Sequence, residues 1–393
     1  MKIVAFLGER YVEYGSLYYA NPTSASFLQK MFGNDNVIIA SQSKKVDALP
    51  QKYSSTVLDT NFISFPYYSS IKQFITNCFF KKKFLQEFIN KSDLIIEQNP
   101  NAIFWVRTPT IGSIIFGLRV LKKKRILINH ICADISNTWR DKKYSFPEKI
   151  FGYFTSKILN FMLSKLCSHK NTLNLTTGLS LEQFSKRYSN NTFQFVDLMI
   201  QSNKQITNKK NNKNLNLTFV GRIVKDKGIF DLLSVIAQLP KNIHLNIVGG
   251  GDDLDSAKAF TQKLNINSNV TFYGQLPFEE INSIYAITDL TIVPSNNYYE
   301  GFPRVIMESW SYGIPVIVSN VGGVNAFVKN NINGIIIPPG NQSELLKSII
   351  TIINNDILFK KLQAGANEMK EISSFEYWSN NTLALVKRHI NEA

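Results

Sequence analysis

The chain has 393 residues, which is more than one hydrophobic core usually organises, so two domains of comparable size are expected. With 44% hydrophobic residues, the composition is that of a folded protein and excludes a largely disordered chain. Lys and Arg number 44 against 29 for Asp and Glu, and the net charge of +15 favours anionic partners, whether phosphorylated small molecules, nucleic acid or a membrane surface.

Cysteine usage and hydropathy indicate a reducing compartment. The three cysteines, Cys78, Cys132 and Cys167, are too far apart for a metal finger and too few for a disulfide framework. The apolar run at residues 1–8 is too short for a secretory signal and predicts a first strand. No run has the length needed to cross a bilayer. We therefore expect a cytoplasmic protein.

Short β-rich runs alternate with longer helical segments through the first half of the chain, which predicts a parallel sheet covered by helices. The expected strands are residues 2–7, 37–40, 93–97, 125–129 and 172–176. The expected helices include residues 110–121 and 146–168. The polar stretch that follows, residues 201–214, is rich in Lys and Asn and predicts an interdomain linker.

A second alternating series begins at residue 215. Its expected strands are residues 215–220, 244–248, 270–273, 290–293, 315–319 and 334–337. Its expected helices are residues 229–239, 254–264, 279–286, 304–312, 343–353 and 356–370, followed by a last helix at 374–390.

The fold class is therefore α/β, with two doubly wound, Rossmann-like domains at residues 1–200 and 215–373. The C-terminal segment 374–393 is expected to pack back on the first domain. Ligands of such sheets bind outside the carboxyl ends of the strands, so the two domains are expected to face a central cleft.

The segment SNNYYEGFPRVIMESWSYG, residues 295–313, holds the densest group of candidate site residues. Gly301 and Pro303 allow a tight entry into a helix, whose first N–H groups can bind phosphate or sugar oxygens. Glu308 lies in that helix and can accept hydrogen bonds from the paired hydroxyls of a ribose or hexose. Alternatively, Glu300 only favours the helix dipole and Glu308 is solvated. Spacing alone leaves both interpretations open.

A second segment, FVGRIVKDKGIF at residues 219–230, places two cations at a strand-to-helix turn. Arg222 and Lys227 can together neutralise a pyrophosphate, and the guanidinium can do so through two parallel hydrogen bonds. Ordinary loop charge is the competing explanation in a chain this basic.

Four fragments between residues 215 and 340 together resemble the donor-binding half of the retaining glycosyltransferases with the GT-B fold, family 4, also called glycosyl transferases group 1. They are GRIVKDKG, IVGGG, EGFPRVIMES and GIPVIVSNVGG, and the third contains an E-x7-E pair. The resemblance implies transfer of a hexose or N-acetylhexosamine from a nucleotide-diphosphate sugar to a glycan or lipid-linked oligosaccharide, with retention. Bacterial surface polysaccharide assembly, of O-antigen, capsule or lipopolysaccharide, is the implied setting.

The resemblance also implies a donor site made of one set of residues: Arg222, Lys227, Glu300, Gly301, Phe302, Pro303 and Glu308. The two cations would bind the diphosphate. Glu300 and the backbone amides after it would hold the transferred sugar, and Glu308 would take the ribose hydroxyls. Pro303 stands where the family commonly has glycine, so one backbone N–H is lost there.

No metal or other cofactor is expected, because cationic side chains and helix dipoles can neutralise the diphosphate. The D-x-D sequence formed by Asp253 and Asp255 opens a helix, where aspartates are explained as caps and dipole partners. Three other classes stay open. They are a sugar-nucleotide epimerase of the same fold, a dinucleotide-dependent oxidoreductase, which lacks its G-x-G-x-x-G, and a non-catalytic nucleotide-binding protein. A nucleic-acid partner is not expected, because no known binding module is present.

The first domain resembles the family less closely. The loop expected after Leu7 holds Gly8 and Gly15, and Gly15 is our choice for close approach to the donor. His130 follows an expected strand, where the family often has a histidine facing the reaction centre, and Asp134 could assist it. A structural role is the alternative for a lone histidine.

Two segments combine large apolar residues with lysines, namely residues 71–90 and 151–166. Such stretches can lie on an anionic inner-membrane surface, and the alternative is an ordinary helix with one buried face. The resemblance favours peripheral membrane contact, since lipid-linked acceptors are common in the family.

Overall fold

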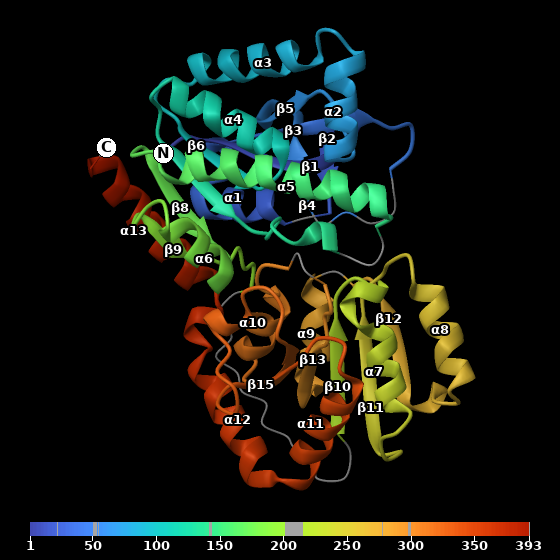
Figure 1. The fold of residues 1–393 in the computed structure, drawn as a ribbon. Helices are drawn as coiled ribbons and strands as arrows, with labels where there is room; N and C mark the ends of the chain where they lie inside the picture. Colours follow the sequence, from blue (N-terminus) through green and yellow to red (C-terminus); the bar gives the residue numbers. More distant parts are fainter. Residues whose placement is uncertain are drawn as a thin grey trace. The chain divides into compact units, whose positions relative to one another are not determined.

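The computed structural model describes residues 1–21, 23–49, 53, 55–140, 144–200, 215–276, 278–297 and 300–392 (Figure 1). The expected linker, residues 201–214, lies outside these ranges. The chain divides into two compact units, Met1–Met199 with Ser379–Ala393 and Ile200–Trp378. Within the described ranges, none of the helices combines the length and the apolar character that a membrane span requires.

A nine-stranded sheet organises the first unit. Its strands are β1 (Ile3–Tyr14), β2 (Leu17–Ala20), β3 (Val37–Lys45), β4 (Ser55–Leu58), β5 (Phe62–Phe65), β6 (Ile103–Thr108), β7 (Leu127–Ile131), β8 (Thr172–Thr176) and β9 (Thr192–Gln194). Seven of them pair in parallel in the order β5-β3-β1-β6-β7-β8-β9. The remaining two, β2 and β4, extend the sheet from β1 in antiparallel pairs.

The helices of the first unit are α1 (Ser24–Phe32), α2 (Ile71–Phe80), α3 (Phe84–Gln98), α4 (Ile111–Lys122), α5 (Phe146–Cys167), α6 (Leu179–Lys186) and most of α13 (Phe375–Glu392). The expected helices 110–121 and 146–168 are confirmed as α4 and α5. The expected strand 93–97 is wrong, because this run lies in α3. Buried Phe88, Ser92 and Ile95 recur there at helical spacing, so the run DLIIE continues a helix face.

The second unit is built on a six-stranded, wholly parallel sheet in the order β12-β11-β10-β13-β14-β15. Its strands are β10 (Leu215–Val220), β11 (Ile243–Val248), β12 (Val270–Gly274), β13 (Leu290–Val293), β14 (Val316–Ser319) and β15 (Gly334–Ile337). Its helices are α7 (Ile229–Ile236), α8 (Leu254–Lys263), α9 (Phe278–Ile287), α10 (Arg304–Ser311), α11 (Gln342–Asn354) and α12 (Asp356–Glu368). Every element expected in this half is confirmed to within a few residues at its ends.

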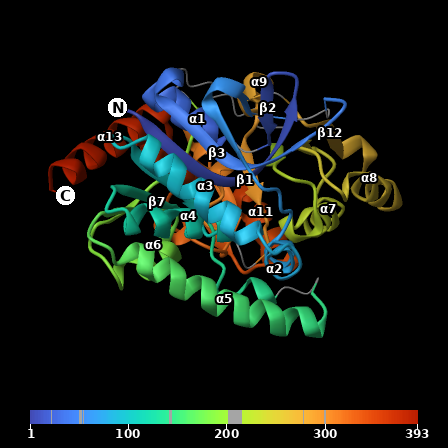
Figure 2. The same ribbon diagram turned by 90° about the horizontal axis from the view of Figure 1, so that it is seen from above.

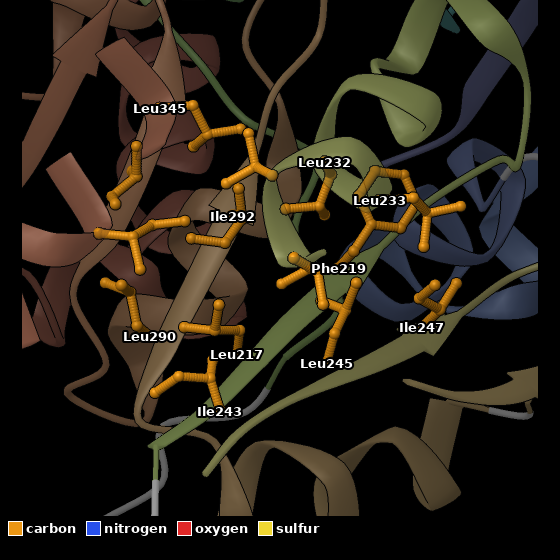
Figure 3. Close-up of a cluster of buried hydrophobic side chains, with 14 of the residues drawn as sticks. Leu217, Phe219, Leu232, Leu233, Ile243, Leu245, Ile247, Leu290, Ile292 and Leu345 are labelled. Carbon is orange, nitrogen blue, oxygen red and sulfur yellow. The ribbon is translucent and has the colours of Figure 1, made fainter. Parts of the chain in front are cut away.

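The core of the second unit follows from the two-residue period of its strands. Leu217, Leu245 and Leu290 come from three adjacent strands and are fully buried, as are Leu232 of α7 and Leu345 of α11 (Figure 3). Side chains on one face of a strand recur every second residue, so the apolar positions of β10 and β11 line a single face. This packing fixes the sheet, and with it the strand ends that carry the candidate site.

Candidate functional site

The strand order of the second sheet reverses direction between β10 and β13, which are neighbours. Chain connections leave the two sides of such a switch point towards opposite faces of the sheet, and ligands of doubly wound sheets bind there. Arg222 and Lys227 lie in the connection after β10, and Glu300 lies in the connection after β13. The sequence therefore delivers its predicted diphosphate and sugar residues to one place on the sheet edge.

Glycines let the connections at this edge touch one another. Gly228 has a φ of +74°, and a Cβ on it would overlap the carbonyl oxygen of Pro294, just past the end of β13. Gly322 has a φ of +54°, and a Cβ there would overlap the carbonyl oxygens of Glu300 and Gly301. Only glycine combines a left-handed φ with such close approach. The Glu300 connection is thus packed between two glycine turns.

The Glu300 carboxylate is held from two sides. The Lys227 ammonium contacts Oε1 directly, and Asn297 Nδ2 donates a hydrogen bond to Oε2 at 3.0 Å. The backbone N–H of Glu300 in turn donates to Asn297 Oδ1 at 3.0 Å. Burial by itself would raise the pKa of Glu300, but the Lys227 charge and the hydrogen bonds from Lys227, Asn297 and Ser295 outweigh it and hold the pKa below its ordinary value. Glu300 is therefore a fixed carboxylate acceptor at neutral pH.

Glu308 has a separate set of partners. It lies on α10, is half-buried, and its Oε2 accepts a hydrogen bond from Tyr285 Oη at 3.2 Å. The Tyr285 ring stacks on Tyr312, with ring centroids 5.1 Å apart. Burial raises the pKa of Glu308, although the Arg304 charge and the Tyr285 hydrogen bond act in the opposite direction. The interpretation of Glu308 as a solvated helix residue is therefore wrong.

The Tyr285→Phe variant is expected to move the acidic limb of the nucleotide-binding pH profile to higher pH. The Tyr285 hydrogen bond favours ionised Glu308, so its loss raises the Glu308 pKa further above the ordinary 4.5. A ligand that donates hydroxyls to the carboxylate then binds more weakly at mildly acidic pH. Nucleotide dissociation constants measured from pH 4.5 to 8 test this. Tyr312→Phe is the control for the ring stack. If the pH midpoint of nucleotide binding is unchanged in Tyr285→Phe, Glu308 does not contact the ligand.

The other predicted donor residues surround the same edge. Arg222 follows Gly221 at the end of β10 and its side chain is exposed. The backbone carbonyl of Gly301 accepts a hydrogen bond from Gly323, and the buried Phe302 ring packs on Phe327 at 5.0 Å. Helix α10 begins at Arg304, as expected, and Pro303 is its N-cap residue.

Asp255 lies in the first turn of α8, where an aspartate favours the helix dipole as expected, whereas Asp253 differs from its expected role as a cap. Asp253 occupies the N-cap position of α8, yet its side chain makes no capping hydrogen bond to that helix. Its Oδ2 instead accepts from the backbone N–H of Lys225 at 2.7 Å, which ties the turn after β10 to the start of α8. In the part of the chain that the structure describes, no three His, Cys, Asp or Glu side chains are grouped to hold a metal ion.

Gly8 and Gly15 do not lie in the one long loop that the sequence predicted. The loop predicted after Leu7 is wrong, because β1 continues to Tyr14 and Gly15 forms the turn to β2. Gly15 has a φ of +62° and open space around its Cβ position. In contrast, Gly8 lies inside β1 with a φ of +65°, where a Cβ would overlap the Thr110 hydroxyl. Gly15 as a donor contact stays a prediction.

His130 lies within β7 and not after a strand end, because the strand runs from Leu127 to Ile131. Its ring is buried and packs edge-on against Phe195, with ring centroids 4.8 Å apart. Its Nε2 forms a hydrogen bond with the Thr177 hydroxyl at 3.1 Å. Asp134 closes a local turn by accepting from the backbone N–H of Ser136 at 2.7 Å. These contacts give His130 a fixed orientation, and its catalytic role stays a prediction.

Sequence reasoning missed Asn297 and Tyr285, which hold the two carboxylates. Asn297 lies three residues before Glu300, so the Asn-x-x-Glu spacing was a usable signal. Tyr285 is 23 residues from Glu308 and comes from another helix, so no local pattern joins them. Gly322 belongs to the GIPVIVSNVGG fragment, but its position against Glu300 appears only in three dimensions.

Two α/β sheets, the first mainly parallel and the second wholly parallel, give the chain the GT-B fold. This is the fold of Anabaena Alr3699/HepE, solved in complex with UDP, which aligns with a TM-score of 0.70 at 14% identity over 99% of this chain and 100% of that one. Residues 200–369 match the family described as glycosyl transferases group 1. The C-terminal unit of this chain belongs to the group 1 glycosyltransferases.

The sequence relatives of this chain include proteins named as glycosyltransferases. The uncharacterized glycosyltransferase MJ1069 of Methanocaldococcus jannaschii is 26% identical over 315 residues, which cover 75% of this chain and 76% of the relative. The lipopolysaccharide 1,6-galactosyltransferase of Escherichia coli K12 is 30% identical over 145 residues, 35% of this chain and 38% of that enzyme. The chain therefore spans well under half of the galactosyltransferase that it resembles.

Proposed function

We propose that the protein is a retaining glycosyltransferase that moves a hexose or N-acetylhexosamine from a nucleotide-diphosphate sugar to a glycan acceptor in bacterial surface polysaccharide synthesis. The observation that carries the proposal is the contact between Lys227 and Glu300 at the switch point of the second sheet. An ammonium and an ionised carboxylate, fixed side by side at a nucleotide-binding edge, offer one group for a diphosphate and one for sugar hydroxyls.

The hydrogen-bonding capacity of this pair fits both ligands at once. A lysine ammonium has three N–H donors, and the contact with Glu300 needs only one of them. Each oxygen of the Glu300 carboxylate has two acceptor sites, so sugar hydroxyls can be bound beside Lys227 and Asn297. Glu308, held by Tyr285, is the proposed acceptor for the ribose hydroxyls.

In the proposed reaction the bond between the anomeric carbon and the diphosphate oxygen breaks, and a bond from the acceptor hydroxyl oxygen to that carbon forms on the same face. The acceptor proton passes to the leaving phosphate oxygen, so the reaction needs no separate base. Lys227 and Arg222 stabilise the negative charge that develops on the leaving diphosphate, which is the main electrostatic task of the site. Glu300 orients the sugar during transfer.

A screen of UDP, GDP, ADP and CDP against the full chain tests the donor assignment, with UDP first because the HepE structure contains it. We expect one nucleotide to raise the melting temperature, since a ligand at 100 times its Kd adds about 2.7 kcal/mol to stability. Transfer assays with the matching sugar donors follow. Failure of all four nucleotides to stabilise the protein would contradict a donor site of this kind.

A sugar-nucleotide epimerase of the same fold is the second candidate, because the nucleotide site alone does not require an acceptor. Incubation of the donor without an acceptor separates the two functions. An epimerase converts the donor to its isomer, whereas a transferase leaves it intact or slowly hydrolyses it. A non-catalytic protein would bind nucleotide and do neither.

A further inference from the structure

The His130 ring has a single orientation in the first unit. His130 is the second-last residue of β7, close to the carboxyl edge at which ligands of doubly wound sheets bind. Its side chain is buried, and the rings of Phe195 and Trp105 pack edge-on against the imidazole, with centroids 4.8 and 6.2 Å away. Both neighbouring rings are buried as well, so the imidazole cannot turn over without displacing a packed side chain.

The Thr177 hydroxyl has two partners but only one proton. Thr177 Oγ1 lies 2.9 Å from the backbone carbonyl oxygen of Phe195 and 3.1 Å from His130 Nε2. A carbonyl oxygen can only accept, so the hydroxyl donates to Phe195. Nε2 must then donate to the hydroxyl oxygen, because the opposite arrangement would set two oxygen lone pairs against each other. The proton of the neutral ring therefore lies on Nε2, and Nδ1 carries the lone pair.

The backbone around Thr177 holds the hydroxyl in this position. The N–H of Thr177 donates to the Ile131 carbonyl oxygen at 3.0 Å, and the N–H of Phe195 donates to the carbonyl oxygen of Thr176 at 2.9 Å. Thr177 lies in the connection from β8 to α6, a helix drawn below β7 in the view of Figure 2. The residue is buried, and a β-branched side chain has little freedom at χ1. The hydroxyl is thus a preorganised partner for the ring.

We propose that Thr177 is a positioning residue, which fixes His130 as the tautomer protonated on Nε2 and keeps Nδ1 as a hydrogen-bond acceptor for a substrate hydroxyl. This inference rests on the proposed transferase function and on the predicted role of His130 in it. The ring then orients a sugar hydroxyl that donates to Nδ1. His130 keeps its own proton throughout, in agreement with a reaction in which the acceptor proton passes to the leaving phosphate.

Nuclear magnetic resonance of the full chain, isotopically labelled at the imidazole nitrogens, reads the tautomer directly at neutral pH. The chain has 4 histidines, and the His130→Gln variant identifies the His130 signals by their loss. We expect the proton of His130 on Nε2 in the unchanged protein. Thr177→Val replaces the hydroxyl by a methyl group and should populate the Nδ1–H tautomer, whereas Thr177→Ser should preserve the original one. A proton on Nδ1 in the unchanged protein would overturn the proposal, whether or not the valine variant folds.

Transfer kinetics test the functional half of the proposal. Thr177→Val should lower kcat by about 10- to 100-fold, the range for a partner that fixes the tautomer of a functional histidine, with little change in the donor KM. Thr177→Ser should have near-normal kcat, because the hydroxyl is retained. A purely structural hydrogen bond would instead lower the melting temperature of Thr177→Val without changing kcat in the folded protein, and that result would overturn the proposal.

A second His–Thr pair provides the matched control. His244 Nε2 lies 2.9 Å from Thr271 Oγ1 in the second unit, so Thr271→Val removes the same kind of hydrogen bond elsewhere. This variant should leave both kcat and the His130 signals unchanged, and an equal loss of kcat in the two valine variants would contradict a specific role of Thr177. Nucleotide binding should be the same in all variants. Failure of the nucleotide screen would remove the transferase assignment, whereas the ring signals of His130 test the tautomer independently, so the two failures are distinguishable.

Discussion

Replacing Lys227 with alanine is expected to reduce the transfer rate by about two to three orders of magnitude, the effect of removing one preorganised donor to a developing negative charge. Two consequences combine in this variant. The leaving diphosphate loses its ammonium partner, and Glu300 loses the charge that keeps its carboxylate ionised although it is buried. The Glu300 pKa therefore rises in the variant, and the remaining activity should shift towards higher pH.

The measurement is kcat and KM for transfer, with nucleotide binding as a separate readout. Lys225→Ala is the matched control, because Lys225 lies in the same short turn with an exposed side chain and contributes only its backbone N–H to Asp253. It should retain near-normal activity. If Lys227 and Glu300 act as one unit, the Lys227→Ala/Glu300→Gln double variant is no slower than the worse single variant. Near-normal turnover of both single variants would remove this pair from the site.

Gly322→Ala is expected to be a severely damaging change in the second unit, although it adds a single methyl group. Its φ of +54° is in the left-handed region, which costs an alanine about 1–2 kcal/mol, and its Cβ would also overlap the carbonyl oxygens of Glu300 and Gly301. The second effect forces the Glu300 connection to move. We expect a loss of several kcal/mol in unfolding free energy, with weakened nucleotide binding in whatever folds.

Gly340→Ala isolates the backbone effect. Gly340 has a φ of +68°, and its Cβ position is open, so only the conformational cost applies. In a unit of this size each kcal/mol corresponds to about 2–4 °C in Tm, and thermal unfolding of the two variants distinguishes the contributions. Equal shifts in both variants would mean that the close approach of Gly322 to Glu300 carries no stability.

Secondary structure in the second unit could be predicted because pattern and tertiary context agree there. Strands such as residues 290–293 and 334–337 are short, β-branched and bounded by polar turns, and they are buried on both faces of a parallel sheet. In the first unit the run at residues 93–97 also has an apolar centre with two isoleucines, Leu94–Ile96. It is helical because it extends the amphipathic face that begins at Phe84, which a short window does not detect.

The first strand was underestimated for a related reason. Residues 8–14 contain two glutamates, an arginine and a glycine, which predict a loop by composition. The strand continues because β3 pairs with it beyond a bulge, where Arg10 aligns with Gln42, and because Glu9 is buried within reach of Arg107 at 3.7 Å. Neighbouring strands and a buried ion pair therefore override local propensity.

The site residues, too, could be predicted where a short motif contains them and not where tertiary packing brings them in. Lys227 and Glu300 were placed together through motif resemblance, and the structure brings their side chains into contact. The residues that position them could not be inferred in the same way, since Tyr285 reaches Glu308 from a different helix. Short motifs identify the groups that touch a ligand, whereas the groups that hold them in place arise from packing between distant segments.

Helix α13 has a consequence for any attempt to divide this chain. Its first residues belong to the second unit, where the Trp378 ring packs on Phe327 at 5.9 Å, and its remainder belongs to the first unit. There His389 shares a 3.1 Å hydrogen bond with Asn191, and the Arg388 guanidinium covers the Phe193 ring at 5.0 Å. A fragment limited to residues 1–199 would leave this flank of β9 bare, because residues 379–393 complete the unit that residues 1–199 form.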